Sequence, residues 1–228
     1  TGSITWLYYS DRLLEFPLGA FGIALATVVL PTLSREHARG QSAQFEGTLD
    51  WSLRLVLTVA FPAAVGLGIL ATPMLTTLFQ YGAFSSQDVI KASHSLWGYA
   101  PALIAVMAVK VLAPGFFSRQ EMKTPVRIAV IAMSANVVFN LLLILPLAHA
   151  GLALATSLSS LLQAVLLVLA LRRAGIQPVA VGFSGFVIRL LLATLGMAAL
   201  LLYFVPPTAQ WFNAPVLWRV SLKFLSTL

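Results

Sequence analysis

Residues 3–33 read SITWLYYSDRLLEFPLGAFGIALATVVLPTL, and this stretch decides the fold. It is longer than the roughly 20 residues that a helix needs to cross a bilayer. It is also mostly apolar, yet it carries Asp11, Arg12 and Glu15 well inside. The stretch therefore predicts a transmembrane helix with charged residues at membrane depth.

The polar residues of this helix share one face, because successive residues are rotated by about 100°. The face consists of Thr5, Tyr8, Arg12, Glu15 and Gly19, with Asp11 at its edge. Three ionised groups facing lipid would cost about 8–10 kcal/mol, which the apolar residues, at about 0.3–0.6 kcal/mol each, barely offset. We therefore expect the charges to pair at i,i+3 and i,i+4 spacing and to face a bundle interior or a watery cavity. The alternative to a functional site is a structural ion pair between helices.

The composition excludes a soluble globular protein. Hydrophobic residues make up 59% of the chain and charged residues 9%, whereas a soluble domain has about 25% charged residues. The net charge of +7 comes mostly from residues at the ends of apolar spans, which is typical of membrane topology and not of nucleic-acid binding. We expect an all-α, polytopic transmembrane helix bundle. Because the chain begins at Thr1 and ends in an apolar segment too short to span, we expect a piece of a longer protein.

Hydropathy predicts about seven spans, the last truncated. They cover residues 3–33, about 50–72, 90–117, 125–147, 151–172 and 184–204, and a start near 215. The polar residues 34–47 are expected to form a loop, and residues 72–91 to lie along the membrane interface. The turn His149-Ala150-Gly151 is so short that its two flanking helices must be antiparallel neighbours.

Small residues and prolines predict how the spans pack and bend. One side of the fifth span carries Ala153, Thr156, Ser157, Ser159, Ser160 and Ala164, which permits close approach of another helix. Kinks are expected where proline and glycine lie together, at residues 17–19, 62–66 and 114–115. Simple packing tolerance is the alternative explanation for these residues.

Basic residues predict the orientation of the chain. The loops and flanks after the first, third and fifth spans hold Arg35, Arg39, Arg54, Arg119, Lys123, Arg127, Arg172, Arg173 and Arg189. The alternate loops hold mainly Lys91, Arg219 and Lys223. The positive-inside rule places the first set in the cytoplasm, so we expect the N-terminus of this piece on the outer side.

Arg12 is the leading candidate for ligand binding, because its guanidinium suits bidentate recognition of a phosphate. Glu15 could hold Arg12 when no ligand is bound, or be its permanent salt-bridge partner. Lys110 would form a second cationic position at another depth if it faces inward; the alternative is that it extends to the nearer interface.

Asn136 and Asn140 lie at i and i+4 on one helix, with Thr156 on the next helix. Their oxygens could bind Na⁺ with backbone carbonyls, and hydrogen bonding between the two helices is the alternative. The three histidines show no ligand spacing, and no nucleophile-base arrangement or Gly-rich phosphate loop is present in the sequence. We therefore expect a protein that is not an enzyme.

Three segments resemble the lipid II flippase family (MurJ, also called MviN) of the multidrug/oligosaccharidyl-lipid/polysaccharide exporter superfamily. They are WLYYSDRLLEFPLGAFGIALATVVLPTLS, LFQYGAF and KVLAPGFFSRQEMKTPVRIA. The resemblance implies a fourteen-helix protein in which two six-helix lobes surround a cationic cavity. Residues 1–173 would be part of the C-terminal lobe (family helices 8 to 12), and residues 174–228 would add helix 13 and the start of helix 14.

The resemblance also implies an activity, a site and a location. The activity is transfer of undecaprenyl-diphosphate-linked peptidoglycan precursor, lipid II, across the bacterial inner membrane by alternating access. The family's functional Arg and Glu fall on Arg12 and Glu15, its Lys on Lys110, and its small polar cavity residue on Thr5; Tyr8 and Asp11 complete the expected site. Some members bind sodium with an acidic group where this chain has the uncharged Asn140.

The implied partners are lipid II, the phospholipid bilayer, the missing N-terminal lobe and cell-wall synthesis enzymes, with no nucleic acid and no cofactor. Sodium, protons or the membrane potential could supply the energy. Two other functions fit the same sequence: an exporter of another polyprenyl-linked glycan or a drug, and a non-transporting scaffold for cell-wall synthesis enzymes.

Overall fold

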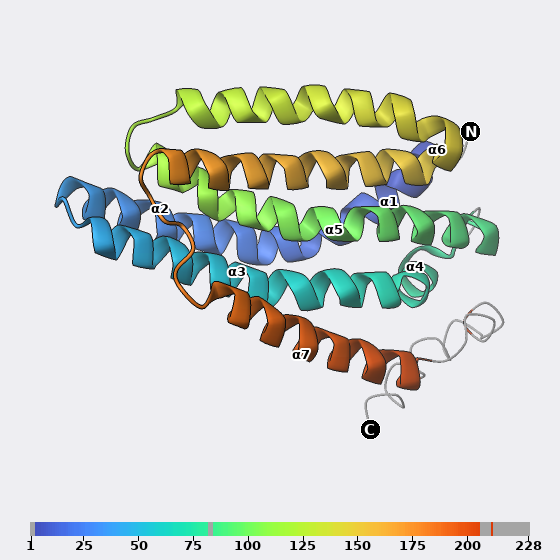
Figure 1. Cartoon of the computed structure of the whole chain (residues 1–228). Coiled ribbons are helices and arrows are strands. Elements are labelled where there is room, and N and C mark those ends of the chain that lie inside the picture. Colours follow the sequence, from blue (N-terminus) through green and yellow to red (C-terminus); the bar gives the residue numbers. More distant parts are fainter. Residues whose placement is uncertain (1–2, 82–83, 206–210, 212–228) are drawn as a thin grey trace.

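The computed structural model describes residues 3–81, 84–205 and 211, and Figure 1 shows these residues as a bundle of helices. The elements are α1 (Ser3–Pro17), η1 (Leu18–Gly22), α2 (Ile23–Ala38), α3 (Ser42–Ile69), α4 (Ala71–Phe79), α5 (Ser86–Phe117), α6 (Lys123–Arg173) and α7 (Phe183–Phe204). All of these elements are helical, which confirms the predicted all-α class. The seventh span, expected from about residue 215, lies outside the described residues.

Four helices are long and apolar enough to cross a membrane: α3, α5, α6 and α7. The segment formed by α1, η1 and α2 adds a fifth if its two bent parts count as a single span. Helix α5 lies at the centre, in contact with α1, α2, α3, α4 and α6. Its side chains Leu96, Leu103 and Met107 are fully buried. The described chain is therefore a polytopic membrane bundle, as predicted.

Helix α6 is a hairpin of two antiparallel helices, which lie side by side in Figure 1. The chain reverses at Ala148, whose φ of 48° and ψ of −125° are not helical. A Cβ at Gly151 would lie 2.2 Å from the carbonyl oxygen of Leu143, so the reversal leaves room only for glycine there. The two halves correspond to the predicted fourth and fifth spans.

The second half of α6 packs very closely on α5, as its small residues predict. A Cβ at Gly98 of α5 would lie 2.9 Å from the Cβ of Ala153. The buried Ser157 hydroxyl donates to the Gly98 carbonyl and accepts from the Ala102 N–H at 3.0 Å. Ser157 therefore inserts between two backbone groups of α5 and ties the hairpin to the bundle.

The predicted loop over residues 34–47 is wrong. Helix α2 continues to Ala38 and α3 already begins at Ser42. The reason is packing between the two helices, because Leu33, Phe45 and Leu49 are all buried there. Polar residues in these turns are compatible with a helix that extends beyond the apolar core of the membrane.

The segment bends several residues beyond the expected position at Pro17, and the other two prolines do not break their helices. Pro17 has no N–H to donate, and the five residues that follow it form the π-helical turn η1. The bend itself comes after this turn, between Ile4–Gly22 and Thr27–Ala38, which are inclined by 42°. By contrast, α3 and α5 continue as helices through Pro62 and Pro114.

The linker between α6 and α7 is held by two acidic residues of α3. The Asp50 carboxylate accepts from the Ala180 N–H at 2.9 Å and forms an ion pair with Arg54 at 2.7 Å. Glu46 accepts from the Gln177 N–H at 2.8 Å. The Arg54 guanidinium also lies 5.5 Å from the ring centre of Phe183, at the start of α7. These contacts fix the position from which α7 begins.

Replacing Asp50 with alanine in the full-length protein should loosen the docking of α7. The change removes an ion pair and leaves a backbone N–H and a guanidinium without their acceptor, which should cost about 1–3 kcal/mol. We expect a lower thermal unfolding temperature in detergent and faster proteolysis of residues 174–182. Asp50→Asn keeps an acceptor for the Ala180 N–H and should show a smaller effect. Unfolding and proteolysis equal to wild type for Asp50→Ala would contradict this role.

Candidate functional site

The candidate site lies on α1, whose rotation is fixed by contacts with α5. Ser10, Leu13, Leu14 and Pro17 are buried on one side of α1. The Ser10 hydroxyl donates to the carbonyl of Ala92 on α5 at 2.7 Å. Because this side faces α5, the polar side of α1 faces away from the described bundle.

An indole contact secures the first turns of α1. The Trp6 Nε1 donates to the Asp88 carboxylate at 2.8 Å. Asp88 is itself held in the capping box that starts α5, where it accepts from the Ser85 N–H at 2.9 Å. The ammonium of Lys91 lies 4.4 Å from the centre of the Trp6 ring. These contacts set the direction of the residues that follow Trp6.

The exposed side of α1 carries the predicted charged pair. Arg12 Nη1 lies 2.6 Å from Glu15 Oε2, and the two side chains are 51% and 54% exposed. The Arg12 guanidinium also lies 4.9 Å from the ring centre of Tyr8. The predicted i,i+3 pairing is confirmed. A guanidinium has five N–H donors, so this arrangement leaves donors that could bind an oxyanion.

Thr5 and Asp11 belong to the same exposed side. No basic side chain of the described residues forms an ion pair with Asp11. The structure therefore brings together Thr5, Tyr8, Asp11, Arg12 and Glu15 on one side of one helix, and no described element covers them.

Lys110 comes from α5 and lies against the same segment, further along. Its side chain is half-buried, and its Cδ would lie only 2.7 Å from a Cβ at Gly22. Gly22 is about 15 Å beyond Arg12 along a helix axis, at 1.5 Å per residue. Among the described residues, no carboxylate pairs with Lys110. Arg12 and Lys110 are thus two cationic positions at different depths along α1, η1 and α2.

The predicted sodium ligands lie between the two halves of α6. Asn136 Nδ2 donates to Ser159 Oγ at 3.1 Å, and Asn140 Nδ2 donates to Asn136 Oδ1 at 2.9 Å. Thr156 Oγ1 donates to the Leu152 carbonyl at 3.1 Å. These bonds support the alternative of interhelical hydrogen bonding. The Asn140 Oδ1 is buried without a partner, and within the described ranges no three acidic, histidine or cysteine residues gather around a metal position. The sodium site stays a prediction.

A protein-family model described as "Lipid II flippase MurJ" matches residues 1–221. The chain belongs to the lipid II flippase MurJ family. Among curated proteins, a probable lipid II flippase MurJ of Haemophilus influenzae is 46% identical over 238 residues, covering 100% of this chain and 46% of that protein. A probable lipid II flippase MurJ of Vibrio cholerae is 46% identical, covering 99% of this chain and 42% of that protein. This chain thus spans less than half the length of these MurJ relatives.

A solved structure supports the fold. "Lipid II flippase MurJ, inward closed conformation" has a TM-score of 0.79 and 24% sequence identity, and the match covers 99% of this chain and 46% of that one. The described bundle therefore has the fold of one half of a MurJ transporter, as the resemblance of the three motifs implies.

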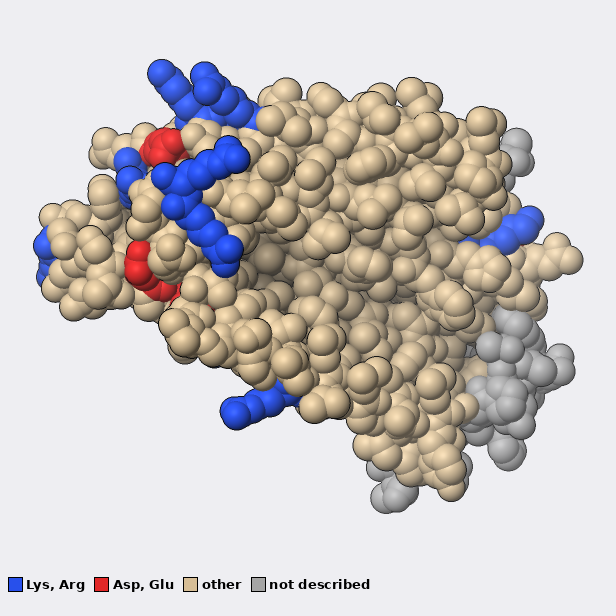
Figure 2. All heavy atoms as spheres, in the orientation of Figure 1, with Lys and Arg blue, Asp and Glu red and all other residues tan. Residues whose placement is uncertain are grey.

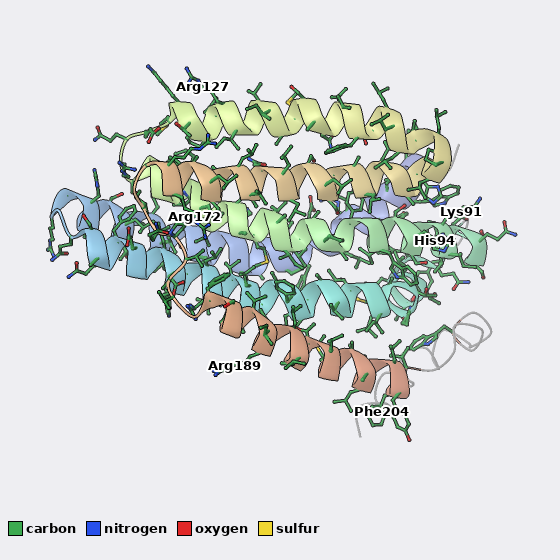
Figure 3. The ribbon with its side chains drawn as sticks, viewed as in Figure 1. Lys91, His94, Arg127, Arg172, Arg189 and Phe204 are labelled. Carbon is green, nitrogen blue, oxygen red and sulfur yellow. The ribbon has the colours of Figure 1, made fainter. Side chains whose placement is uncertain are left out.

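Basic residues gather at one end of this MurJ bundle. Figure 2 shows most of the visible Lys and Arg side chains at the end where α2 meets α3 and α5 meets α6. Figure 3 shows Arg127 and Arg172 there, with Lys91 and His94 at the opposite end. The charge asymmetry that the sequence predicts across the membrane is therefore present in the structure.

Sequence reasoning missed two features that shape the candidate site. The first is the contact between Trp6 and Asp88, which are 82 residues apart. The second is Gly22, whose lack of a side chain admits Lys110. Pro17 indicated a bend in this segment, but no pattern in the sequence indicated which residue of another helix would lie against it.

Proposed function

We propose that this chain is the C-terminal part of a flippase that moves lipid II across the bacterial inner membrane by alternating access. The observation that carries the proposal is the half-exposed guanidinium of Arg12, far inside an apolar segment, with Glu15 as its ion-pair partner. An arginine at this depth is costly unless it faces water or an anion. The diphosphate of a lipid-linked precursor supplies an anion with the geometry that a guanidinium binds.

Glu15 would hold Arg12 in place between transport cycles. The diphosphate would compete with the Glu15 carboxylate for the guanidinium, and Tyr8, stacked near Arg12, would limit the movement of that side chain. Thr5 and Asp11 would line the same wall of the cavity. Lys110 would provide the second cationic position, so that the anionic group passes from one cation to the other during the conformational change.

The other half of the protein would close the cavity. Besides the charged residues, the uncovered side of α1 exposes Ile4 at 81% and Phe16 at 79%. Apolar side chains exposed beside charges indicate a surface that another part of a protein or lipid covers. We propose that an N-terminal lobe of the same chain covers it, with water and the substrate between the lobes. Residues 1–173 would belong to the C-terminal lobe, and residues 174–228 would add helices beside it.

The proposed orientation follows from the basic end of the bundle. By the positive-inside rule, this end lies in the cytoplasm and the N-terminus of the piece lies outside. No cofactor is required by this proposal. The driving force would be the membrane potential or a coupling ion, sodium or a proton, and the Asn136, Asn140 and Thr156 group is the proposed position for sodium.

Reconstitution of the full-length protein in liposomes tests the function. Fluorescent lipid II is placed in one leaflet, and its arrival in the other leaflet is measured with an impermeant quencher. We expect faster translocation than in protein-free liposomes, and competition by a polyprenyl diphosphate but not by a cationic drug. Competition by the drug alone would favour a drug exporter. Translocation no faster than in protein-free liposomes would favour the scaffold.

A further inference from the structure

Gly22 closes the π-helical turn η1 at the point where α5 crosses the bent segment. It is buried. A Cβ built on Gly22 would lie 2.7 Å from Lys110 Cδ, 3.1 Å from Cε and 3.5 Å from Nζ. The last three atoms of the lysine side chain therefore run directly past the glycine, in space that a methyl group would take.

We propose that Gly22 is a positioning residue for Lys110: its missing side chain forms the slot that sets where the ammonium lies along the transport path. This inference rests on the proposed function, in which Lys110 meets the diphosphate. The slot depends on the turn as well as on the glycine, because a π-helical turn carries one extra residue and rotates the residues that follow it. Gly22 thus faces α5 although Arg12, ten residues earlier, faces away from the bundle.

The contact is suited to a functional role because a side chain added at Gly22 would displace the lysine side chain without disturbing the fold. The atoms nearest to the added methyl group belong to the end of a flexible side chain and not to the backbone. Alanine is also a better helix former than glycine. We therefore expect Gly22→Ala to fold normally and to push the Lys110 side chain out of the slot.

Gly19 offers a matched control within the same turn. A Cβ at Gly19 would have no atom within 4 Å. Gly19→Ala therefore changes the backbone freedom of η1 in the same way as Gly22→Ala but leaves Lys110 in place. Any difference between the two variants reports on the lysine and not on the loss of a glycine.

The test is a double-mutant cycle in the full-length protein, with translocation of fluorescent lipid II in liposomes as the readout. We expect Lys110→Ala and Gly22→Ala each to slow translocation by about tenfold, because small displacements of a binding group have effects of this size or larger. In the Lys110→Ala background, Gly22→Ala should have no further effect. Gly196→Ala in α7, whose added Cβ would also meet no atom within 4 Å, should transport at the wild-type rate.

A second readout does not depend on transport. Modification of Lys110 by a water-soluble amine-reactive ester, followed by mass spectrometry, should change in rate in Gly22→Ala and stay unchanged in Gly19→Ala. If Lys110→Ala transports at the wild-type rate, the proposed role of Lys110 is wrong. If Lys110→Ala is slow but Gly22→Ala keeps wild-type transport and labelling, the positioning role alone is wrong. Independent, multiplying effects of the two changes would also contradict it.

Discussion

Replacing Arg12 with alanine should slow lipid II translocation by the full-length protein by about a hundredfold. The change removes the charge-assisted hydrogen bonds that a guanidinium makes with a diphosphate, worth about 3 kcal/mol, and a factor of ten corresponds to about 1.4 kcal/mol. Arg12→Lys keeps the charge but loses the planar pair of donors, so we expect an intermediate loss of about tenfold. Translocation in liposomes measures both effects.

Two further variants separate this effect from folding and from the scaffold alternative. Arg12→Ala leaves Glu15 unpaired, whereas Arg12→Ala combined with Glu15→Gln removes both charges. Equal slowing in the two variants would show that the loss comes from Arg12 and not from an isolated carboxylate. If the protein is a scaffold, Arg12→Glu should be harmless while changes at Arg35 or Arg119 are not. Unimpaired translocation by Arg12→Ala would remove the site assignment.

Of the substitutions proposed here, Gly151→Ala should lower the free energy of unfolding the most. The added Cβ would lie 2.2 Å from the carbonyl oxygen of Leu143 and 2.7 Å from its carbonyl carbon. Both atoms belong to the backbone of the facing helix, so the hairpin of α6 must open to relieve the overlap. We expect a cost of about 3 kcal/mol, at the upper end of what overpacking usually costs, measured as a lower unfolding temperature of the full-length protein in detergent.

Two variants serve as controls for this prediction. A Cβ at Gly196 of α7 would meet no atom within 4 Å, so Gly196→Ala should not lower stability. Ala148, at the reversal, has a φ of 48° and a ψ of −125°, which is the glycine-favouring first central position of a type II′ turn. Ala148→Gly should therefore raise the unfolding temperature or leave it unchanged. An unfolding temperature for Gly151→Ala equal to that of Gly196→Ala would contradict this account of the turn.

The helical class, the spans and the hairpin could be predicted because long apolar runs and short turns determine them locally. The ion pair between Arg12 and Glu15 could be predicted for the same reason, since charges inside an apolar span are costly and i,i+3 pairing follows from the helical period. The early start of α3 at Ser42 was missed, because it depends on burial of Phe45 and Leu49 against α2, and that packing is not visible in hydropathy.

The surroundings of Lys110 could not be predicted from sequence for a related reason. A lysine near the end of a span can extend to the interface or lie against a neighbouring helix, and both fit the same pattern. Which of the two occurs here depends on Gly22, which has no side chain. Gly22 lies on a different helical segment from Lys110, at the end of a π-helical turn. Likewise, Asn136 and Asn140 showed a shared face in the sequence, but the hydrogen bond of Asn136 across the hairpin depends on Ser159.

The central claim is that the polar side of α1 faces a hydrated chamber in which a diphosphate meets Arg12. Thr5→Cys tests it directly in a full-length protein without other cysteines, because Thr5 lies two turns before Arg12 on the same exposed side. The thiol should react quickly with an impermeant, water-soluble reagent, and lipid II should slow the reaction when Arg12 is present but not in Arg12→Ala. Reaction as slow as that of Leu195→Cys, an apolar position of α7 that is 64% exposed, would contradict the claim, as would labelling that lipid II does not slow.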